Sequence, residues 1–124
     1  MIEYLIEQLQ TDYRIATLSR GYKRATSGFV LANPHATADS IGDEPFQFFS
    51  KYQNLIVAVD ENRQRGIQQL LNLKLKPQII LLDDAFQHRK VAVGCNILLT
   101  AYNDLYTDDL LLPTGNLREP VVGA

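Results

Sequence analysis

The sequence contains little that would suit a disulfide-bonded, membrane-spanning or nucleic-acid-binding protein. Its single cysteine, Cys95, cannot form an internal disulfide, and the apolar residues around it predict a buried, unreactive thiol. Lys and Arg number 12 against 14 Asp and Glu, a formal net charge of −2, which provides no broad basic field for nucleic acid or an anionic membrane. No apolar run approaches the roughly 18 to 20 residues that span a bilayer, and the N-terminus lacks the pattern of a signal peptide. Any phosphate group must therefore be bound by a few local side chains, and we expect a soluble chain.

The sequence also lacks the glycine-rich loop G-x-x-x-x-G-K-[ST], whose backbone N–H groups and lysine hold the phosphates of a nucleotide. None of the seven glycines is followed by lysine. The chain opens instead on an amphipathic helix, in which Ile2, Leu5, Ile6 and Leu9 form one apolar stripe with no capping residue before it. A helix of this kind is what should follow a phosphate-binding loop, so we expect that sequence is missing upstream.

What the sequence does contain is a series of apolar strands separated by helices. Its 124 residues, 46% hydrophobic and 21% charged, are enough for one ordinary domain. Strands are predicted at 14–19, 27–32, 55–59, 78–82 and 95–100. Helices are predicted at 2–9 and 60–73, and a third is predicted to begin at Asp43, with an apolar face of Phe46, Phe49 and Tyr52. Apolar strands without alternation are typical of a parallel sheet covered on both faces. We therefore predict an α/β fold, a mostly parallel sheet with helices on both faces, and an irregular segment at 102–124.

The polar residues that follow the strands are the candidates for chemistry, because ligands of open α/β sheets bind beyond the carboxyl ends of the strands. They are Arg20, then Asp60 and Arg63, then Asp83, Asp84, Gln87 and His88. An apolar strand that ends in two aspartates has the form of a Walker B element, in which a carboxylate binds Mg²⁺ and positions the phosphates of a nucleotide. The alternative is that the aspartates only turn the chain out of the sheet and that His88 is a surface histidine.

Several other residues have two interpretations each. Asp43 could cap the N-terminus of its helix, or it could be a base that accepts a hydroxyl proton during phosphoryl transfer. Arg20, Arg63 and Arg118 could bind phosphate oxygens through their planar guanidinium groups, or they could be solvated surface residues. We assign Arg24 to the surface.

Four motifs in this order and at these spacings resemble one protein family. They read Leu18-Ser-Arg-Gly-Tyr22, Gly42-Asp-Glu-Pro45, Asp83-Asp-Ala-Phe-Gln-His88 and Leu112-Pro-Thr-Gly-Asn-Leu-Arg-Glu-Pro120. Together they resemble the tetraacyldisaccharide 4′-kinase (lipid A 4′-kinase) family of Gram-negative bacteria, and the resemblance runs from Met1 to the end of the chain. No single motif would suffice for this assignment.

The resemblance implies a P-loop kinase of lipid A biosynthesis at the cytoplasmic face of the bacterial inner membrane. Such an enzyme transfers the γ-phosphate of ATP to the 4′-hydroxyl of tetraacyldisaccharide 1-phosphate. It implies ATP and Mg²⁺ as cofactors, the lipid A disaccharide precursor as partner, contact with the inner-membrane surface through an N-terminal region that this chain lacks, and no nucleic acid. Residues 1–124 would then be a partial, P-loop NTPase-like kinase domain without its phosphate loop and C-terminal part, and inactive alone.

The resemblance also assigns roles to individual positions. It implies metal binding by Asp83 and Asp84, nucleotide contacts by Asp84, Gln87 and His88, catalytic roles for Asp43, Arg63 and Arg118, and substrate binding by Arg20 and Tyr22. The family usually has glycine where this chain has Ala85. If the backbone there needs a positive φ, alanine would cost on the order of 1 kcal/mol.

Two competing interpretations stand beside this one. The first is a non-catalytic α/β binding or interaction domain, in which the paired aspartates hold a metal or cap a loop. The second is another Mg²⁺-dependent phosphotransferase or hydrolase, for which only Asp43 or Asp60 offers a third metal ligand.

Overall fold

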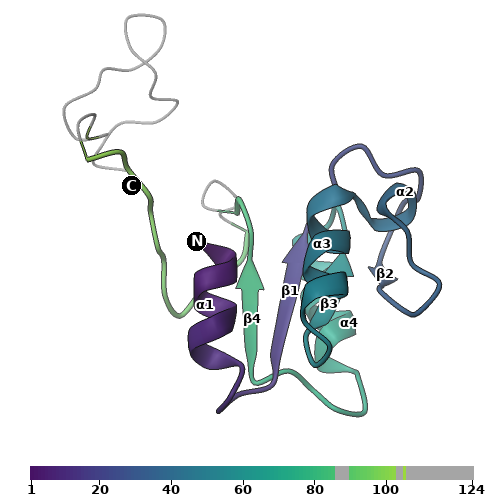
Figure 1. The fold of residues 1–124 in the computed structure, drawn as a ribbon, viewed down its shortest axis with the longest axis horizontal. Helices are drawn as coiled ribbons and strands as arrows, with labels where there is room; N and C mark the ends of the chain where they lie inside the picture. Colours follow the sequence, from purple (N-terminus) through teal and green to yellow (C-terminus); the bar gives the residue numbers. More distant parts are fainter. Residues whose placement is uncertain (86–89, 103–104, 106–124) are drawn as a thin grey trace, which may run out of the picture. The chain divides into compact units, whose positions relative to one another are not determined.

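The computed structural model describes residues 1–85, 90–102 and 105, and it divides into two units, Met1–Ala92 and Val93–Ala124. The first unit contains all the helices and multi-residue strands that are described (Figure 1). In chain order they are α1 (Ile2–Leu9), β1 (Ile15–Ser19), β2 (Val30–Leu31), α2 (Ala38–Ile41), α3 (Asp43–Lys51), β3 (Ile56–Val59), α4 (Arg63–Leu71) and β4 (Ile79–Leu82).

The four strands form one sheet in the order β2-β3-β1-β4. Strand β1 pairs in parallel with both β3 and β4, whereas the short β2 pairs antiparallel with β3. The predicted mostly parallel α/β fold is thus confirmed. Since β1, β3 and β4 run in the same direction, the residues that follow them all emerge at one edge of the sheet.

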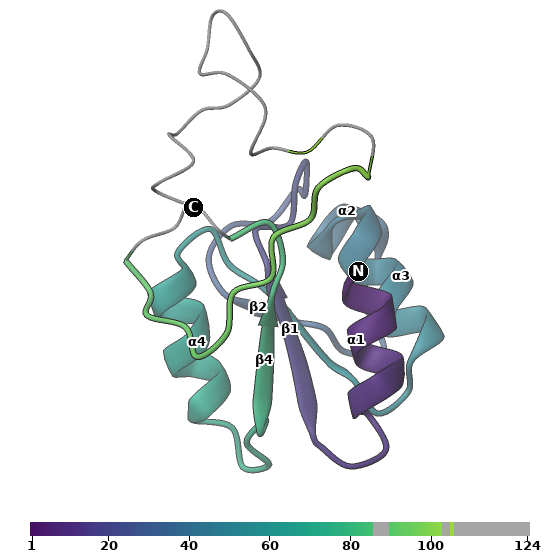
Figure 2. The ribbon, with the colours of Figure 1, turned by 90° about the vertical axis from the view of Figure 1, so that its left-hand side faces the viewer.

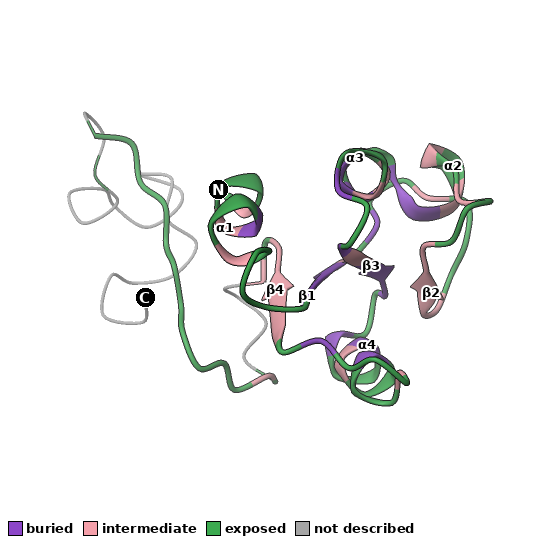
Figure 3. Cartoon of the chain, turned by 60° about the horizontal axis from the view of Figure 1, so that its bottom comes forward, coloured by how far each residue is buried: buried purple, intermediate pink, exposed green. Residues whose placement is uncertain are grey.

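Helices cover both faces of this sheet, as predicted (Figure 2). On one face Ile15, Val57 and Val59 pack with Ile6 of α1 and with buried residues of α2 and α3. On the other face Ala16, Leu18 and Ala58 pack with Leu70 of α4. This division follows from strand geometry, because successive side chains along a strand point to opposite faces. Figure 3 shows the result as buried residues along the central β1 and β3, with β2 and β4 less covered.

Local hydrogen bonds decide where the helices begin. The helix predicted from residue 60 starts at Arg63, because the Asn62 side chain accepts a hydrogen bond from the backbone N–H of Arg65 at 3.1 Å and caps it. Helix α2 was not predicted. Thr37 and Ser40 form a capping box at its start, in which each side chain accepts a hydrogen bond from the other residue's backbone N–H.

The apolar face of α3 differs slightly from the predicted one. Phe46 and Phe49 are only partly buried, whereas Pro45 and Phe48 are buried and pack toward the sheet together with Tyr52. The three predicted aromatics do lie in or against the core, but the predicted set omitted Phe48.

The second unit departs from two predictions. Residues 95–100 do not form the predicted strand, and Cys95 is exposed and not buried. An apolar segment becomes a strand only where a neighbouring strand satisfies its backbone groups, and none of the described ladders includes these residues. Most of the irregular segment predicted at 102–124 lies outside the described residues. Among the helices of the described part, none has the length and apolar character needed to cross a membrane.

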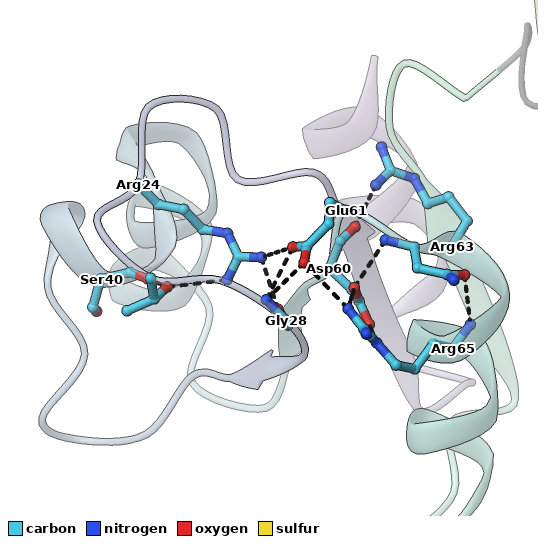
Figure 4. Close-up of polar contacts among 9 residues, drawn as sticks. Arg24, Gly28, Ser40, Asp60, Glu61, Arg63 and Arg65 are labelled. Atoms are coloured by element: carbon cyan, nitrogen blue, oxygen red, sulfur yellow. Dashed lines mark hydrogen bonds and ion pairs between the residues drawn. The ribbon is translucent and has the colours of Figure 1, made fainter.

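The prediction that Arg24 is a solvated surface residue is wrong, because its side chain is only 4% exposed. It lies in the loop between β1 and β2 and donates hydrogen bonds to Thr26, to the Gly28 carbonyl and to the Glu61 carboxylate (Figure 4). Glu61 also accepts hydrogen bonds from the Gly28 backbone N–H and from Arg65. The loop is thereby tied to the junction between β3 and α4.

These contacts keep Glu61 ionised in acid. Hydrogen bonds from its own backbone N–H and from that of Gly28, together with the Arg24 guanidinium, lower the pKa of the Glu61 carboxyl from 4.5 to about 2. A carboxyl whose pKa is lower in the folded state stabilises that state above its unfolded pKa, and this contribution is lost as the pH falls from 4.5 toward 2.

We therefore predict that the folded state loses less stability in acid when this carboxyl is removed. Between pH 5 and pH 3, the urea midpoint should fall by a smaller amount in Glu61→Gln than in the unsubstituted chain, because the glutamine has no proton to bind. Circular dichroism at the two pH values measures this. Glu3→Gln, which removes an exposed carboxylate from the far helix α1, serves as the control. Equal falls in Glu61→Gln and the parent would contradict the prediction.

A second prediction concerns Gly66, where α4 lies against β1. A Cβ there would be 2.8 Å from both Cδ atoms of Leu18, which is fully buried, and 3.2 Å from the Cβ of Asp60. Gly66→Val should therefore overpack the interface and lower the free energy of unfolding by about 2 kcal/mol. Thermal unfolding measures this against Gln69→Val, which places the same side chain on an exposed position of α4. Equal melting temperatures for the two variants would contradict the prediction, because they would show that the interface between α4 and β1 accommodates the larger side chain.

Candidate active site

The candidate residues begin where the three parallel strands end. The ladder extends one step past the strands, since the Asp60 N–H donates to the Ser19 carbonyl at 2.9 Å and the Asp83 N–H donates to the Leu18 carbonyl at 3.3 Å. Arg20, Asp60 and Asp83 therefore start at nearly the same level of one sheet edge. This is the edge at which ligands bind in open α/β sheets.

Two glycines bring the Arg20 loop against the start of α3. Gly21 has φ +72° and Gly42 has φ +96°, a region that residues with a side chain rarely adopt. A Cβ on Gly42 would be 3.3 Å from the Gly21 Cα, so the two backbones are in direct contact. The motif that contains Arg20 and the motif that contains Asp43 thus meet through their glycines.

One interpretation made Asp43 the N-cap of its helix, and the structure shows that this is wrong. Gly42 occupies the N-cap position and Asp43 is the first helical residue, with its side chain exposed. The φ of +96° and the close approach to Gly21 favour glycine at the cap, because a residue with a side chain would be strained there. Within the part of the chain that the structure describes, no hydrogen bond or ion pair engages the Asp43 carboxylate. That carboxylate is therefore available to a ligand.

Glu44, next to Asp43, is a member of the site that the sequence analysis missed. Glu44 is an exposed residue, but partial loss of water around its carboxyl, and then the nearby Asp83, raise the pKa of that carboxyl. The amino group of Met1 acts in the opposite direction, which places the start of α1 near the same edge. The position of Glu44 in the Gly-Asp-Glu-Pro motif could have marked it as a site residue. Periodicity alone does not say which side chain in the first turn of α3 faces β4.

Arg63 is held inside this cluster. It is 6% exposed, and its Nη1 donates to the Asp60 carbonyl at 2.7 Å while its Nη2 lies 3.5 Å from the Asp83 carbonyl. Its Nε is buried without a hydrogen-bond partner in the described part of the structure. Burial lowers the pKa of the guanidinium and the neighbouring Arg20 adds to this, whereas Asp83, Asp60 and Asp84 raise it. Arg20 and Arg63 thus lie close enough for their positive charges to repel each other, and such a pair of guanidinium groups suits the binding of an anion.

The two strand-end aspartates leave the sheet by a sharp turn. Asp84 has φ +45°, a conformation that aspartate tolerates better than most residues, and it is exposed, while Asp83 is half-buried. Ala85 is not among the described residues with positive φ, so alanine in place of the usual glycine adds no left-handed strain.

The remaining predicted residues lie apart from this cluster or outside the described residues. Tyr22 is 78% exposed, and the Lys23 ammonium lies 5.3 Å from the centre of its ring. Gln87, His88 and Arg118 fall outside the described residues.

Asp83 and Asp84 have the donor chemistry for Mg²⁺, which binds proteins through one or two carboxylates and takes its other ligands from water and phosphate. In the described ranges, no group of three or more His, Cys, Asp or Glu side chains is arranged to hold a metal ion. Neither Asp43 nor Asp60 therefore provides the third ligand of a cage made by the protein alone. Asp60 is fully buried and forms a two-point ion pair with Arg65 at 2.6 and 2.9 Å.

Comparison with known proteins identifies the family. A family model described as LpxK, tetraacyldisaccharide-1-P 4′-kinase, matches residues 1–124. The chain is 64% identical over 123 residues to a tetraacyldisaccharide 4′-kinase of Flavobacterium psychrophilum and 57% identical over 122 residues to one of Bacteroides fragilis. These alignments cover 99% and 98% of this chain, but 36% and 32% of the relatives.

A solved structure agrees with the sequence relatives. The fold superposes on LpxK from Aquifex aeolicus, crystallised as an "apo" form in complex with ATP, with a TM-score of 0.80 and 39% sequence identity. That match covers 98% of this chain and 39% of the LpxK chain. The fold is thus that of a P-loop kinase, and the chain spans about a third of the length of the relatives it matches. On these grounds the chain belongs to the tetraacyldisaccharide 4′-kinase family.

Proposed function

We propose that the protein to which this chain belongs transfers the γ-phosphate of ATP to the 4′-hydroxyl of a tetraacyldisaccharide 1-phosphate in lipid A biosynthesis. We place this reaction at the cytoplasmic face of the bacterial inner membrane, where the acyl chains of the substrate would be held. The observation that carries the proposal is the meeting of three motif loops at one sheet edge, through the Gly21–Gly42 contact and the backbone hydrogen bond from Asp83 to Leu18, with Glu44 near Asp83.

The acidic residues of this edge would have different roles in phosphoryl transfer. Asp43 is exposed at the first turn of α3, where it can accept the proton of the attacking hydroxyl. Asp83 and Asp84 would hold Mg²⁺, which neutralises charge on the transferring phosphoryl group when it is bound. Gln87 and His88 follow them in sequence and belong to the same proposed nucleotide site.

The arginines provide fixed positive charge for the same reaction. Arg63 is buried and is held by the Asp60 carbonyl, so it needs no reorganisation to offset the charge of a phosphoryl group. We assign Arg118 the same kind of role. Arg20 and Tyr22, on the exposed loop after β1, would bind the phosphorylated sugar head group.

A chimera tests the proposal directly. Residues 1–124 would replace the 123-residue matched segment of the F. psychrophilum kinase, whose remaining sequence would complete the domain. Transfer of radiolabelled phosphate from ATP to tetraacyldisaccharide 1-phosphate is expected from the purified chimera. A chimera that folds like the parent kinase and transfers no phosphate would contradict the proposal.

In this chimera, Asp43→Asn should lower kcat by about 10²- to 10⁴-fold, because it removes the general base. The melting temperature and ATP affinity should stay unchanged, since Asp43 caps no helix and its carboxylate has no partner among the described residues. Asp39→Asn is the control, at an exposed aspartate in the first turn of α2. If Asp43→Asn instead lost ATP binding or stability, the role of Asp43 would be structural.

Asp84→Asn should raise the Mg²⁺ concentration needed for half-maximal turnover by about 10-fold or more, since loss of even an outer-shell partner weakens metal sites by 10- to 100-fold. Asparagine also tolerates the positive φ of this position, so the turn itself should persist. A Mg²⁺ titration of turnover measures the effect, with the exposed Asp12→Asn as control. An unchanged Mg²⁺ requirement would mean that Asp84 only turns the chain.

A further inference from the structure

Hydrogen bonds hold the loop between β1 and β2 on two sides. On one side, the Ala25 N–H donates to the Asp39 carbonyl at 2.7 Å and the Thr26 hydroxyl donates to the Ser40 carbonyl at 2.5 Å, which ties the loop to α2. On the other side, the anchor is the Glu61 side chain, which follows β3. The loop is thus held between two elements that lie far apart in the sequence.

Glu61 makes the contacts that hold the loop on the side of β3. Its carboxylate accepts hydrogen bonds from the Gly28 N–H at 2.8 and 3.1 Å, from Arg24 at 2.5 Å and from Arg65 at 3.3 Å (Figure 4). Arg65 in turn is fixed by its two-point ion pair with the fully buried Asp60. An exposed carboxylate with this many charge-assisted partners is held in place, unlike an ordinary surface glutamate.

The Arg24 side chain carries this restraint to the candidate active site. It passes so close over Gly21 that a Cβ there would be 2.5 Å from the Arg24 Cδ. Gly21 lies between Arg20 and Tyr22 and is in backbone contact with Gly42, the residue before Asp43. The Arg24 stem therefore lies against the backbone that carries the two proposed substrate-binding residues, and Glu61 holds the guanidinium at the end of that stem.

We propose that Glu61, acting through Arg24, is a positioning residue for the lipid substrate: it fixes the Arg20–Tyr22 loop in the conformation that binds the phosphorylated disaccharide. This inference rests on the proposed function and adds to it a residue that does not itself touch the reacting atoms. Neither Glu61 nor Arg24 lies in any of the four motifs.

The physical consequence falls on substrate affinity and spares the chemical step. Without the Glu61 anchor the loop samples other conformations, and the substrate must select the competent one, which weakens apparent binding by the fraction that is competent. Once the substrate is bound the loop is ordered, so Asp43 and the aspartates at the end of β4 act as before. A loss confined to substrate binding raises KM and leaves kcat unchanged.

The test uses the chimera defined above, with Glu61→Gln and Arg24→Lys as separate variants and Glu3→Gln as the matched control. Glutamine keeps the shape of Glu61 but loses its charge, and lysine cannot reach Thr26, Gly28 and Glu61 together as the guanidinium does. Each variant should raise KM for tetraacyldisaccharide 1-phosphate about 10-fold, the equivalent of one charge-assisted hydrogen bond. kcat and KM for ATP should stay within about twofold of the parent values, a split that general destabilisation does not produce. The double variant should raise KM no further than the singles, because the two residues act as one unit.

The outcomes separate this inference from the proposed function. An unsubstituted chimera that folds but transfers no phosphate overturns the proposed function and, with it, the present inference. An active chimera in which Glu61→Gln and Arg24→Lys keep the KM of the Glu3→Gln control overturns the positioning role alone. A fall in kcat with unchanged KM for the lipid also overturns it, since it would place Glu61 in the chemical step.

Discussion

The parallel pairing of β1 with both β3 and β4 is the constraint on which the rest of the structure depends. It places β1 in the middle of the sheet with both faces covered, so Ile15 on one face and Leu18 on the other are buried. It also aligns three carboxyl ends at one edge, because parallel strands that share a register end together. The backbone bonds from Asp60 to Ser19 and from Asp83 to Leu18 continue this alignment into the loops. The chemistry-bearing residues therefore lie together although Arg20 and Asp84 are 64 positions apart in the sequence.

The site that this alignment builds is mixed in charge, which the net charge of −2 does not reveal. The acidic side consists of Glu44, Asp83 and Asp84, and partial burial together with the nearby Asp83 raises the pKa of the Glu44 carboxyl. The basic side consists of Arg63, buried and incompletely hydrogen-bonded, with Arg20 close by. Of these groups Arg63 is buried and Asp83 is half-buried, and groups held at fixed positions away from water stabilise charge that develops during a reaction better than mobile surface groups do. The arrangement suits a phosphoryl group together with a divalent cation.

Around this site, ion pairs determine the loop conformations. Arg24 and Glu61 hold the loop after β1, and the fully buried Asp60 with Arg65 holds Glu61. On the opposite side of the sheet, Lys51 of α3 pairs with Glu3 and Glu7 of α1 on the surface. The two groups of ion pairs differ in kind: exposed pairs such as those of Lys51 contribute little to stability, whereas a buried carboxylate with two-point hydrogen bonding is costly to disturb. The loop network is therefore the one with consequences for the site.

The main strands of the sheet and the family of this protein could be predicted from the sequence alone. The apolar runs at 55–59 and 78–82 predicted β3 and β4 to within a residue, because continuous apolar runs of this length are typical of strands in a sheet covered on both faces. The motifs that carry Arg20, Asp43, Asp83 and Asp84 predicted the family, which the comparisons confirmed. Only the tertiary structure decided that Gly42 and not Asp43 caps α3, that Arg24 is buried, that Glu44 faces Asp83, and that residues 95–100 form no strand. Each of these depends on contacts between segments distant in sequence, and periodicity describes only what one segment does by itself.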